Sequence, residues 1–172
     1  MPNIVRRQLG FGILYAVLAV FSAAEVSIGQ ERGSVTNLPI PRYVSLKASK
    51  ANARRGPSLS HRIDWVFTRK HMPLEIYGEY ENWRRVRDID GAGGWIHYSL
   101  LSGARTAILT VDMQPLLNLP VEGSMIVARF EKGAIADVEK CDPMWCQLSA
   151  GGYKGWVPKE AIWGVHPEEI KE

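Results

Sequence analysis

The chain has few of the residues on which catalytic and metal sites are usually built. Its 172 residues include two cysteines and four histidines. The histidines are scattered, and the sequence contains no Gly-x-Ser-x-Gly elbow, no HExxH pair and no phosphate-binding loop. Because no group of residues forms a catalytic constellation, we expect a protein that is not an enzyme and that uses no cofactor or metal.

Long apolar runs are also scarce, and the one that is present lies near the N-terminus. Residues 9–24 carry no charge, follow Arg6 and Arg7, and end in the small residues Ser-Ala-Ala. This run of 16 residues is shorter than the roughly 20 that a spanning helix needs, and its layout is typical of a cleaved export signal. We therefore expect residues 1–24 to be a signal peptide, with an uncleaved anchor as the alternative. The mature chain is then periplasmic or secreted, with no later membrane span.

The two cysteines, Cys141 and Cys146, lie close together, which suits a redox couple, half of a metal site or a disulfide. An oxidising compartment favours the disulfide. A zinc site needs four ligands, and no second cysteine pair or nearby histidine supplies the others. Thioredoxin-type chemistry uses C-x-x-C at a helix start, whereas this pair spans a turn containing Asp142 and Pro143. We therefore predict a disulfide that staples a hairpin.

The sequence after residue 42 contains an internal repeat. Residues 72–86 align without a gap over residues 134–148, and residues 93–103 align over residues 154–164. Two copies of one module of about 60 residues are the simplest explanation. The alignment pairs Trp83 with Trp145, Val86 with Leu148, Trp95 with Trp156 and Gly103 with Gly164.

Each copy consists of short runs rich in β-branched and aromatic residues, such as IDWVF and PLEIYGEY, separated by turn formers. The four residues after each Gly-Trp strand are too few for a helix and suit a single 3₁₀ turn. Five short strands in each copy predict a small, partly open barrel. The fold class is therefore all-β, with two tandem barrels. We assign residues 25–42 to a linker, 43–106 to barrel 1, 107–167 to barrel 2 and 168–172 to a tail.

The order of these motifs resembles that of the bacterial SH3-like domains of exported proteins. The first copy contains NARRGPS (52–58), a W-x-x-V strand and a G-W-I strand, and the second keeps the W-x-x-L and G-W-V strands. The second copy has QPLLNLPVEG (114–123) in place of the arginine-rich turn. The resemblance implies tandem SH3-like barrels that bind or brace something in the cell envelope, without catalysis. Because the aromatic start and adjacent tryptophans of eukaryotic SH3 domains are missing, we do not expect binding of PxxP peptides.

The four repeat-equivalent tryptophans, at positions 83, 95, 145 and 156, either fill the barrel cores or contact a ligand. We favour the core, because buried aromatics dominate such small cores. Strand alternation places Trp83 and Val86 on opposite faces, so both can be buried only with a bulge, and we expect one of them at the surface. An exposed Trp83 would lie on the same face as Arg85 and Arg87, forming an aromatic and cationic patch.

Charge is distributed unevenly along the chain. Residues 42–105 contain 12 lysines and arginines against 6 acids, whereas residues 106–172 contain 6 against 10. The first barrel is therefore basic and the second acidic. This asymmetry indicates either an anionic partner for barrel 1 or electrostatic attraction between the two barrels.

We expect a non-catalytic exported binding module that recognises peptidoglycan or cell-wall peptide through a basic and aromatic face of barrel 1. Arginine presents donors at the spacing of two carboxylate oxygens, so Arg54 and Arg55 suit carboxylates, solvated turn residues being the alternative. A structural or adaptor role, in binding another envelope or host protein, is the second hypothesis. Nucleic acid is disfavoured because the aromatic interleaving of single-strand binders is missing. The candidate ligand-binding residues are Arg54, Arg55, Trp83, Arg85, Arg87 and Trp95.

Overall fold

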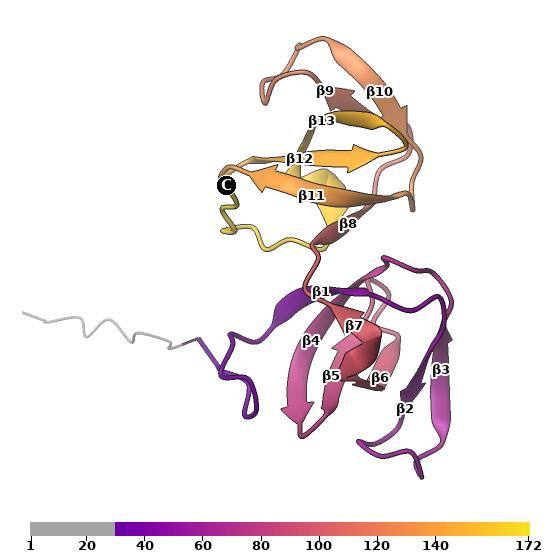
Figure 1. The fold of residues 1–172 in the computed structure, drawn as a ribbon. Helices are drawn as coiled ribbons and strands as arrows, with labels where there is room; N and C mark the ends of the chain where they lie inside the picture. The colour runs from indigo at the N-terminus through magenta and orange to yellow at the C-terminus, as the bar shows by residue number, and fades with distance from the viewer. Residues whose placement is uncertain (1–29) are drawn as a thin grey trace, which may run out of the picture.

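The structure is a computed structural model that describes residues 30–172. The predicted signal peptide, residues 1–24, lies outside the described residues. The described part of the chain forms two seven-stranded antiparallel sheets, one after the other in the sequence (Figure 1). Within it, no helix has both the length and the apolar character needed to cross a membrane. The prediction of an all-β fold with two tandem barrels is confirmed.

Barrel 1 has the strand order β3-β2-β6-β5-β4-β1-β7. Short turns join β4 to β5 and β5 to β6, as expected where turn formers separate branched and aromatic runs. A 3₁₀ turn, η1, precedes the last strand, as predicted. The elements are β1 (Arg42–Leu46), β2 (Ala51–Arg54), β3 (Ile63–Phe67), β4 (Pro73–Tyr80), β5 (Trp83–Arg87), β6 (Gly93–His97), η1 (Tyr98–Leu100) and β7 (Leu101–Ser102).

Barrel 2 has the same arrangement, with the order β10-β9-β13-β12-β11-β8-β14. Each of its strands therefore has a counterpart in the same place in barrel 1, which confirms that the sequence repeat is a structural repeat. The elements are β8 (Thr106–Leu109), β9 (Gln114–Leu117), β10 (Ile126–Phe130), β11 (Ile135–Cys141), β12 (Trp145–Ala150), β13 (Tyr153–Pro158), η2 (Lys159–Ala161) and β14 (Ile162–Trp163).

Each barrel has its own apolar core, and neither core cluster contains a tryptophan. Most of the fully buried side chains that fill the interiors are aliphatic, such as Leu46, Leu74, Leu116 and Leu148. Trp95, Trp145 and Trp156 are only partly buried. The prediction that the four tryptophans fill the cores is therefore wrong.

Trp83 and Val86 are both buried, which corrects the expectation that one of them lies at the surface. Val86 is fully enclosed in the core, and Trp83 is 8% exposed. Trp83 lies on the opposite face of β5, where the ring of His97 packs against it at 5.6 Å between centroids. The partner strand β4 also has a register shift between Ile76 and Gly78. Alternation is kept along β5, but neighbouring residues cover its outer face as well.

The described part of the segment that we interpreted as a linker is attached to barrel 1. Ile40 belongs to the barrel 1 core. The backbone N–H groups of Val35 and Thr36 donate to one carboxylate oxygen of Glu79, at 3.0 and 2.8 Å. The hydroxyl of Thr36 donates to the other oxygen at 2.7 Å. This N-terminal segment, residues 30–41, therefore packs onto the barrel instead of connecting freely to it.

Glu79 is the centre of a buried charge cluster. Its side chain is fully buried, and it pairs with Arg42 at 2.7 Å and with the Nε of Arg84 at 3.5 Å. Burial by itself raises the pKa of Glu79. The hydrogen bonds from Thr36, Arg42 and Val35 outweigh burial and lower the pKa to about 2.

The two barrels contact each other around a connector of three residues, 103–105. The Thr106 hydroxyl donates to the His71 carbonyl at 2.7 Å, and Arg69 donates to the Gly133 carbonyl at 2.7 Å. The rings of Tyr43 and Trp163 meet edge to face at 5.1 Å. Among the described residues, no ion pair joins a strand of one barrel to a strand of the other. The strands of the two barrels are therefore held together without ion pairs, whereas Arg105 of the connector, counted with the basic first half, pairs with Glu169 of the acidic second half.

The Glu79 cluster predicts a specific acid sensitivity. Because the pKa of Glu79 is lowered from 4.5 to about 2, its ionised form stabilises the fold above pH 4.5, and this contribution is lost as the pH falls through about 2. The Glu79→Gln variant should lack this contribution, on the order of 3 kcal/mol. Urea unfolding between pH 2 and pH 7 measures it, with Glu81→Gln, in the adjoining turn, as the control. Parallel pH profiles for Glu79→Gln and the unmodified protein would contradict the assignment.

Candidate functional site

A pocket of about 230 Å³ opens on barrel 1 between the ends of β2, β5 and β6. Strand register explains its composition, because Trp95 lies opposite both Arg54 on β2 and Arg85 on β5. We call it the arginine pocket. The side chains that line it include Arg54, Arg55, Asp64, Tyr77, Arg85 and Trp95.

The glycine-rich β5–β6 turn allows β2 to approach β6 at this pocket. Gly94 has a φ of +148°, and a Cβ there would lie 2.6 Å from the carbonyl oxygen of Arg54. A larger residue at this position would push β2 away from β6. The sequence GAGG, residues 91–94, therefore allows β2 and β6 to pair at the wall of the arginine pocket.

The arginine pocket carries excess positive charge. Asp64 is shared by Arg55 at 3.1 Å and Arg62 at 2.6 Å. Burial raises the pKa of Asp64, but the hydrogen bonds from Arg62 and Arg55 outweigh it and lower the pKa overall. Arg85 lies 5.1 Å from the centre of the Tyr77 ring and has no carboxylate partner among residues 30–172. An anion, and a carboxylate in particular, is the ligand that this arrangement suits.

Four of the six candidate ligand-binding residues line the arginine pocket, namely Arg54, Arg55, Arg85 and Trp95. Arg54 also has a structural task, because its Nη1 donates to the carbonyls of Leu59 at 3.0 Å and His61 at 2.6 Å. It thereby holds the loop between β2 and β3 in place.

Arg87 lies beside the arginine pocket and does not line it. Its guanidinium lies 5.2 Å from the centre of the Tyr77 ring. It also pairs with Glu75 at 2.5 Å, and this hydrogen bond raises the pKa of Arg87. Arg87 is therefore already neutralised by a neighbouring carboxylate.

Trp83 belongs to a different site, formed by two adjoining clefts of about 360 and 580 Å³. Both clefts are lined by Leu59, Trp83, His97 and Leu100. The loop between β2 and β3 forms one wall, and η1 forms the other. Arg85 and Arg87, with which the sequence grouped Trp83, line neither cleft, whereas Arg54 lines the smaller cleft together with Trp83.

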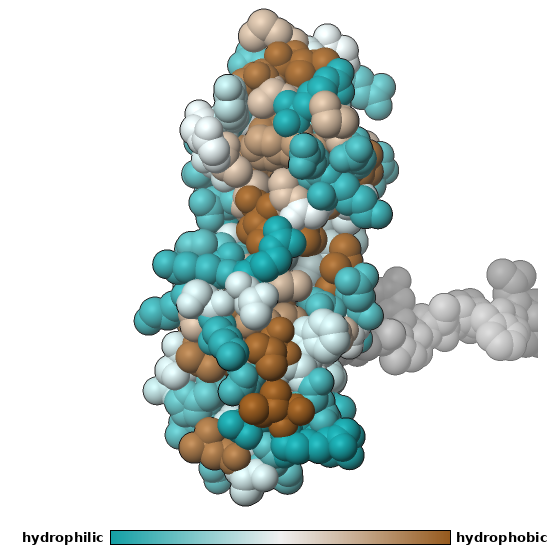
Figure 2. Space-filling view, turned by 90° about the vertical axis from the view of Figure 1, so that its right-hand side faces the viewer, coloured by the Kyte–Doolittle hydropathy of each residue, from teal (hydrophilic) through white to brown (hydrophobic). Residues whose placement is uncertain are grey.

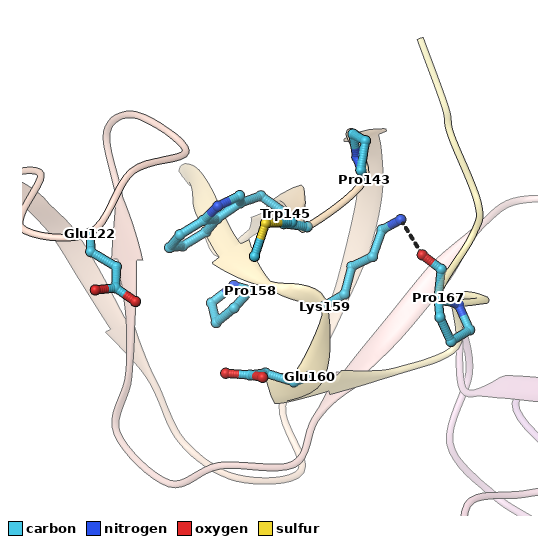
Figure 3. A pocket seen from close by; sticks show the side chains of 8 residues that line it. Glu122, Pro143, Trp145, Pro158, Lys159, Glu160 and Pro167 are labelled. Atoms are coloured by element: carbon cyan, nitrogen blue, oxygen red, sulfur yellow. Dashed lines mark hydrogen bonds between the residues drawn. The ribbon is translucent and has the colours of Figure 1, made fainter.

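Barrel 2 has a counterpart of the Trp83 clefts, which sequence reasoning missed. This cleft, of about 320 Å³, lies beside Trp145, the repeat-equivalent of Trp83. Figure 3 shows the Trp145 indole and the Pro158 ring bordering one space, with the carboxylates of Glu122 and Glu160 at its edge. The alignment of Trp145 over Trp83 is the signal that could have revealed it.

The Trp145 cleft differs in charge from the sites of barrel 1. Its one cation, Lys159, donates to the backbone carbonyls of Pro167 at 2.9 Å and Glu169 at 2.6 Å. Within the described part of the chain, Glu122 and Glu160 form no ion pair. The barrel 2 cleft is therefore acidic, whereas the arginine pocket is basic.

The predicted disulfide between Cys141 and Cys146 is confirmed. The two residues face each other across β11 and β12, and both are buried in the barrel 2 core. Asp142 makes the turn between them, because its Oδ1 accepts hydrogen bonds from the N–H groups of Met144 at 2.8 Å and Trp145 at 2.7 Å. Within residues 30–172, no cluster of histidine, cysteine, aspartate and glutamate is arranged to hold a metal ion.

Comparison with known proteins gives two kinds of match. The sequence model of the bacterial SH3 domain family matches residues 47–103 and 110–164. Two solved structures from Trichomonas vaginalis, NlpC2 and NlpC1, are similar at 16% and 17% identity, each with a TM-score of 0.34. The alignments cover 72% and 89% of this chain but 48% and 51% of those chains, so this chain spans about half their length. No curated protein matches.

The disulfide predicts a measurable loss of stability on reduction. Closing so short a loop should stabilise barrel 2 by about 2 kcal/mol in the chain-entropy model. Urea unfolding with and without a reductant measures this difference. The doubly substituted variant Cys141→Ala, Cys146→Ala is the control and should not respond to the reductant. Two free thiols in mass spectra of the exported protein would contradict the staple.

Proposed function

The chain belongs to the bacterial SH3 domain family, which it matches twice in tandem, and from this premise we propose a function for it. The protein is a non-catalytic exported binding module of the cell envelope. It recognises peptidoglycan or cell-wall peptide through the arginine pocket of barrel 1.

The arginine pocket is the observation that carries this proposal. Three arginines and one aspartate line a single concave site, next to two aromatic rings. Guanidinium groups bind carboxylates through paired hydrogen bonds, and aromatic faces provide contact area for the neighbouring part of a ligand. The free carboxylates of wall stem peptides supply such groups in the envelope.

Arg85 is the residue of the arginine pocket most available to a ligand. Arg54 is occupied with the carbonyls of Leu59 and His61, and Arg55 is paired with Asp64. Arg85 is exposed, and its guanidinium lies over the ring of Tyr77. Substitution of Arg85 therefore tests ligand binding with the least effect on the fold.

The disulfide and the N-terminal sequence support the proposed location. A buried cystine is typical of proteins that fold in an oxidising compartment. The exported state also agrees with the charge-free run at residues 9–24.

A second candidate function, an adaptor for another envelope protein, is favoured by the edge strand β3. This strand ends the barrel 1 sheet, and three of its apolar residues, Ile63, Trp65 and Val66, are 45%, 47% and 39% exposed. Figure 2 looks onto this side of the molecule and shows hydrophobic surface interrupted by hydrophilic residues. An edge strand with unpaired backbone groups can accept a strand from a partner.

Retention on purified peptidoglycan sacculi tests the wall-binding proposal. The protein should be retained more strongly than a denatured control, and retention should fall above roughly 0.15 M salt because exposed charge contacts are screened. Arg85→Ser should lose retention. Lys140→Ser, which removes one exposed positive charge from barrel 2, is the matched control and should keep it.

Two outcomes would count against the proposal. No retention above the denatured control would exclude wall binding and favour the adaptor. Equal retention of Arg85→Ser and the unmodified protein would exclude the arginine pocket as the site.

A further inference from the structure

A separate cleft of about 310 Å³ lies in barrel 1 between the N-terminal segment and strands β1 and β7. Apolar side chains make up most of its wall, and two arginines lie among them. None of the six candidate ligand-binding residues lines it. We call it the β1 cleft. The residues that line it include Leu38, Arg42, Tyr43, Arg84, Tyr98 and Gly103.

The β1 cleft has one positive charge more than its neighbours neutralise. Glu79 is the carboxylate partner of both Arg42 and Arg84. Arg42 uses Nη2 for this pair, and its Nη1 is buried without a hydrogen-bond partner. A buried donor without a partner is costly, and an unbalanced buried charge is more so. An added carboxylate would relieve both.

The structural repeat identifies the counterpart of Arg42 in barrel 2. Ile76 lies opposite Arg42 in the pairing of β4 with β1. Val138, which aligns with Ile76, donates its N–H to the carbonyl of Arg105. Arg105 is therefore the equivalent of Arg42. The block alignments likewise pair Tyr98 with Lys159 and Gly103 with Gly164.

In barrel 2 the C-terminal residues 164–169, which we call the tail from here on, occupy this position. Arg105 binds the Glu169 carboxylate with both terminal nitrogens, at 2.7 and 2.9 Å, and the carbonyl of Gly164 at 2.7 Å. Lys159 binds the carbonyls of Pro167 and Glu169. The equivalents of two lining residues of the β1 cleft, Arg42 and Tyr98, thus both contact residues 164–169, and the equivalent of a third, Gly103, begins that segment.

We propose that the β1 cleft binds a short acidic peptide segment of a partner protein. A carboxylate of that segment pairs with Arg42, which turns slightly to present Nη1, as Glu169 pairs with Arg105 in barrel 2. The apolar walls receive the neighbouring side chains, as barrel 2 receives those of its own tail. This site is distinct from the arginine pocket and does not depend on wall binding.

The tail itself supplies the probe. A peptide with the sequence GVHPEEI, residues 164–170, blocked at both ends, is titrated into the full-length exported chain labelled with ¹⁵N. We expect amide shifts at residues 101–103, next to the β1 cleft. A peptide carrying Glu169→Gln should bind at least about tenfold more weakly, because it loses a charge-assisted bidentate pair.

Gly103 provides a matched pair of variants. A Cβ at this position meets no atom within 4 Å, so a side chain can be added there without a clash at its root. Gly103→Phe should fill the β1 cleft and abolish the shifts, whereas Gly103→Ala should keep them. Arg42→Lys keeps the charge but loses the fork, and it should also weaken binding.

Three results would overturn the proposal. The first is the absence of amide shifts in barrel 1, and the second is equal binding of the Glu169→Gln peptide and the unmodified peptide. The third is a set of shifts confined to residues 159–169, which would mean that the peptide replaces the tail in barrel 2. A concentration-dependent dimer without added peptide would show instead that the tail of a second copy is the occupant. Because the assay uses no sacculi, its failure would leave the wall-binding proposal untouched.

Discussion

The pairing of the first strand of each repeat holds the structure together. β1 pairs with β4 on one side and β7 on the other, and β8 does the same with β11 and β14. Each first strand thereby joins the long meander to the short strand that ends the repeat. Modules of about 60 residues bury a small core, so closing the sheet in this way contributes much of what makes each one stable.

The first strand also brings a basic side chain to the place where a flanking segment arrives. Arg42 begins β1 and meets the N-terminal segment through Glu79, and Arg105 precedes β8 and meets the tail through Glu169. The position of Glu79 is taken in barrel 2 by Cys141, whose backbone pairs with that of Lys171. A segment from outside the strand repeat therefore packs onto each barrel, one from each end of the chain.

Sequence patterns were sufficient for features that depend on neighbouring residues. The all-β class, the repeat and the Cys141–Cys146 staple all follow from alternation, motif order and turn chemistry over short distances. The burial of Trp83 could not be predicted, because alternation indicates the face on which a residue lies and not what covers that face. Ile40 was missed for a related reason, since flanking prolines suggested a linker and nothing local indicated a core contact.

The candidate site was predictable in composition but not in arrangement. Arg54, Arg55, Arg85 and Trp95 were identified by residue type and charge, and only the strand register shows that they line one pocket. Trp83 lies on the same face of β5 as Arg85, opposite His97, but it lines the neighbouring clefts instead. The Trp145 cleft and the β1 cleft depend on loops and on a segment far away in sequence, for which the repeat alone gives partial guidance.

The short connector between β7 and β8 limits the distance between the two barrels. Three residues and the Thr106–His71 hydrogen bond leave little freedom between the barrels. If each barrel carries a binding site, a polymer gains avidity only when its repeating groups match the separation that this connector sets. Such a pair of sites would select for the periodicity of a target as well as for its chemistry.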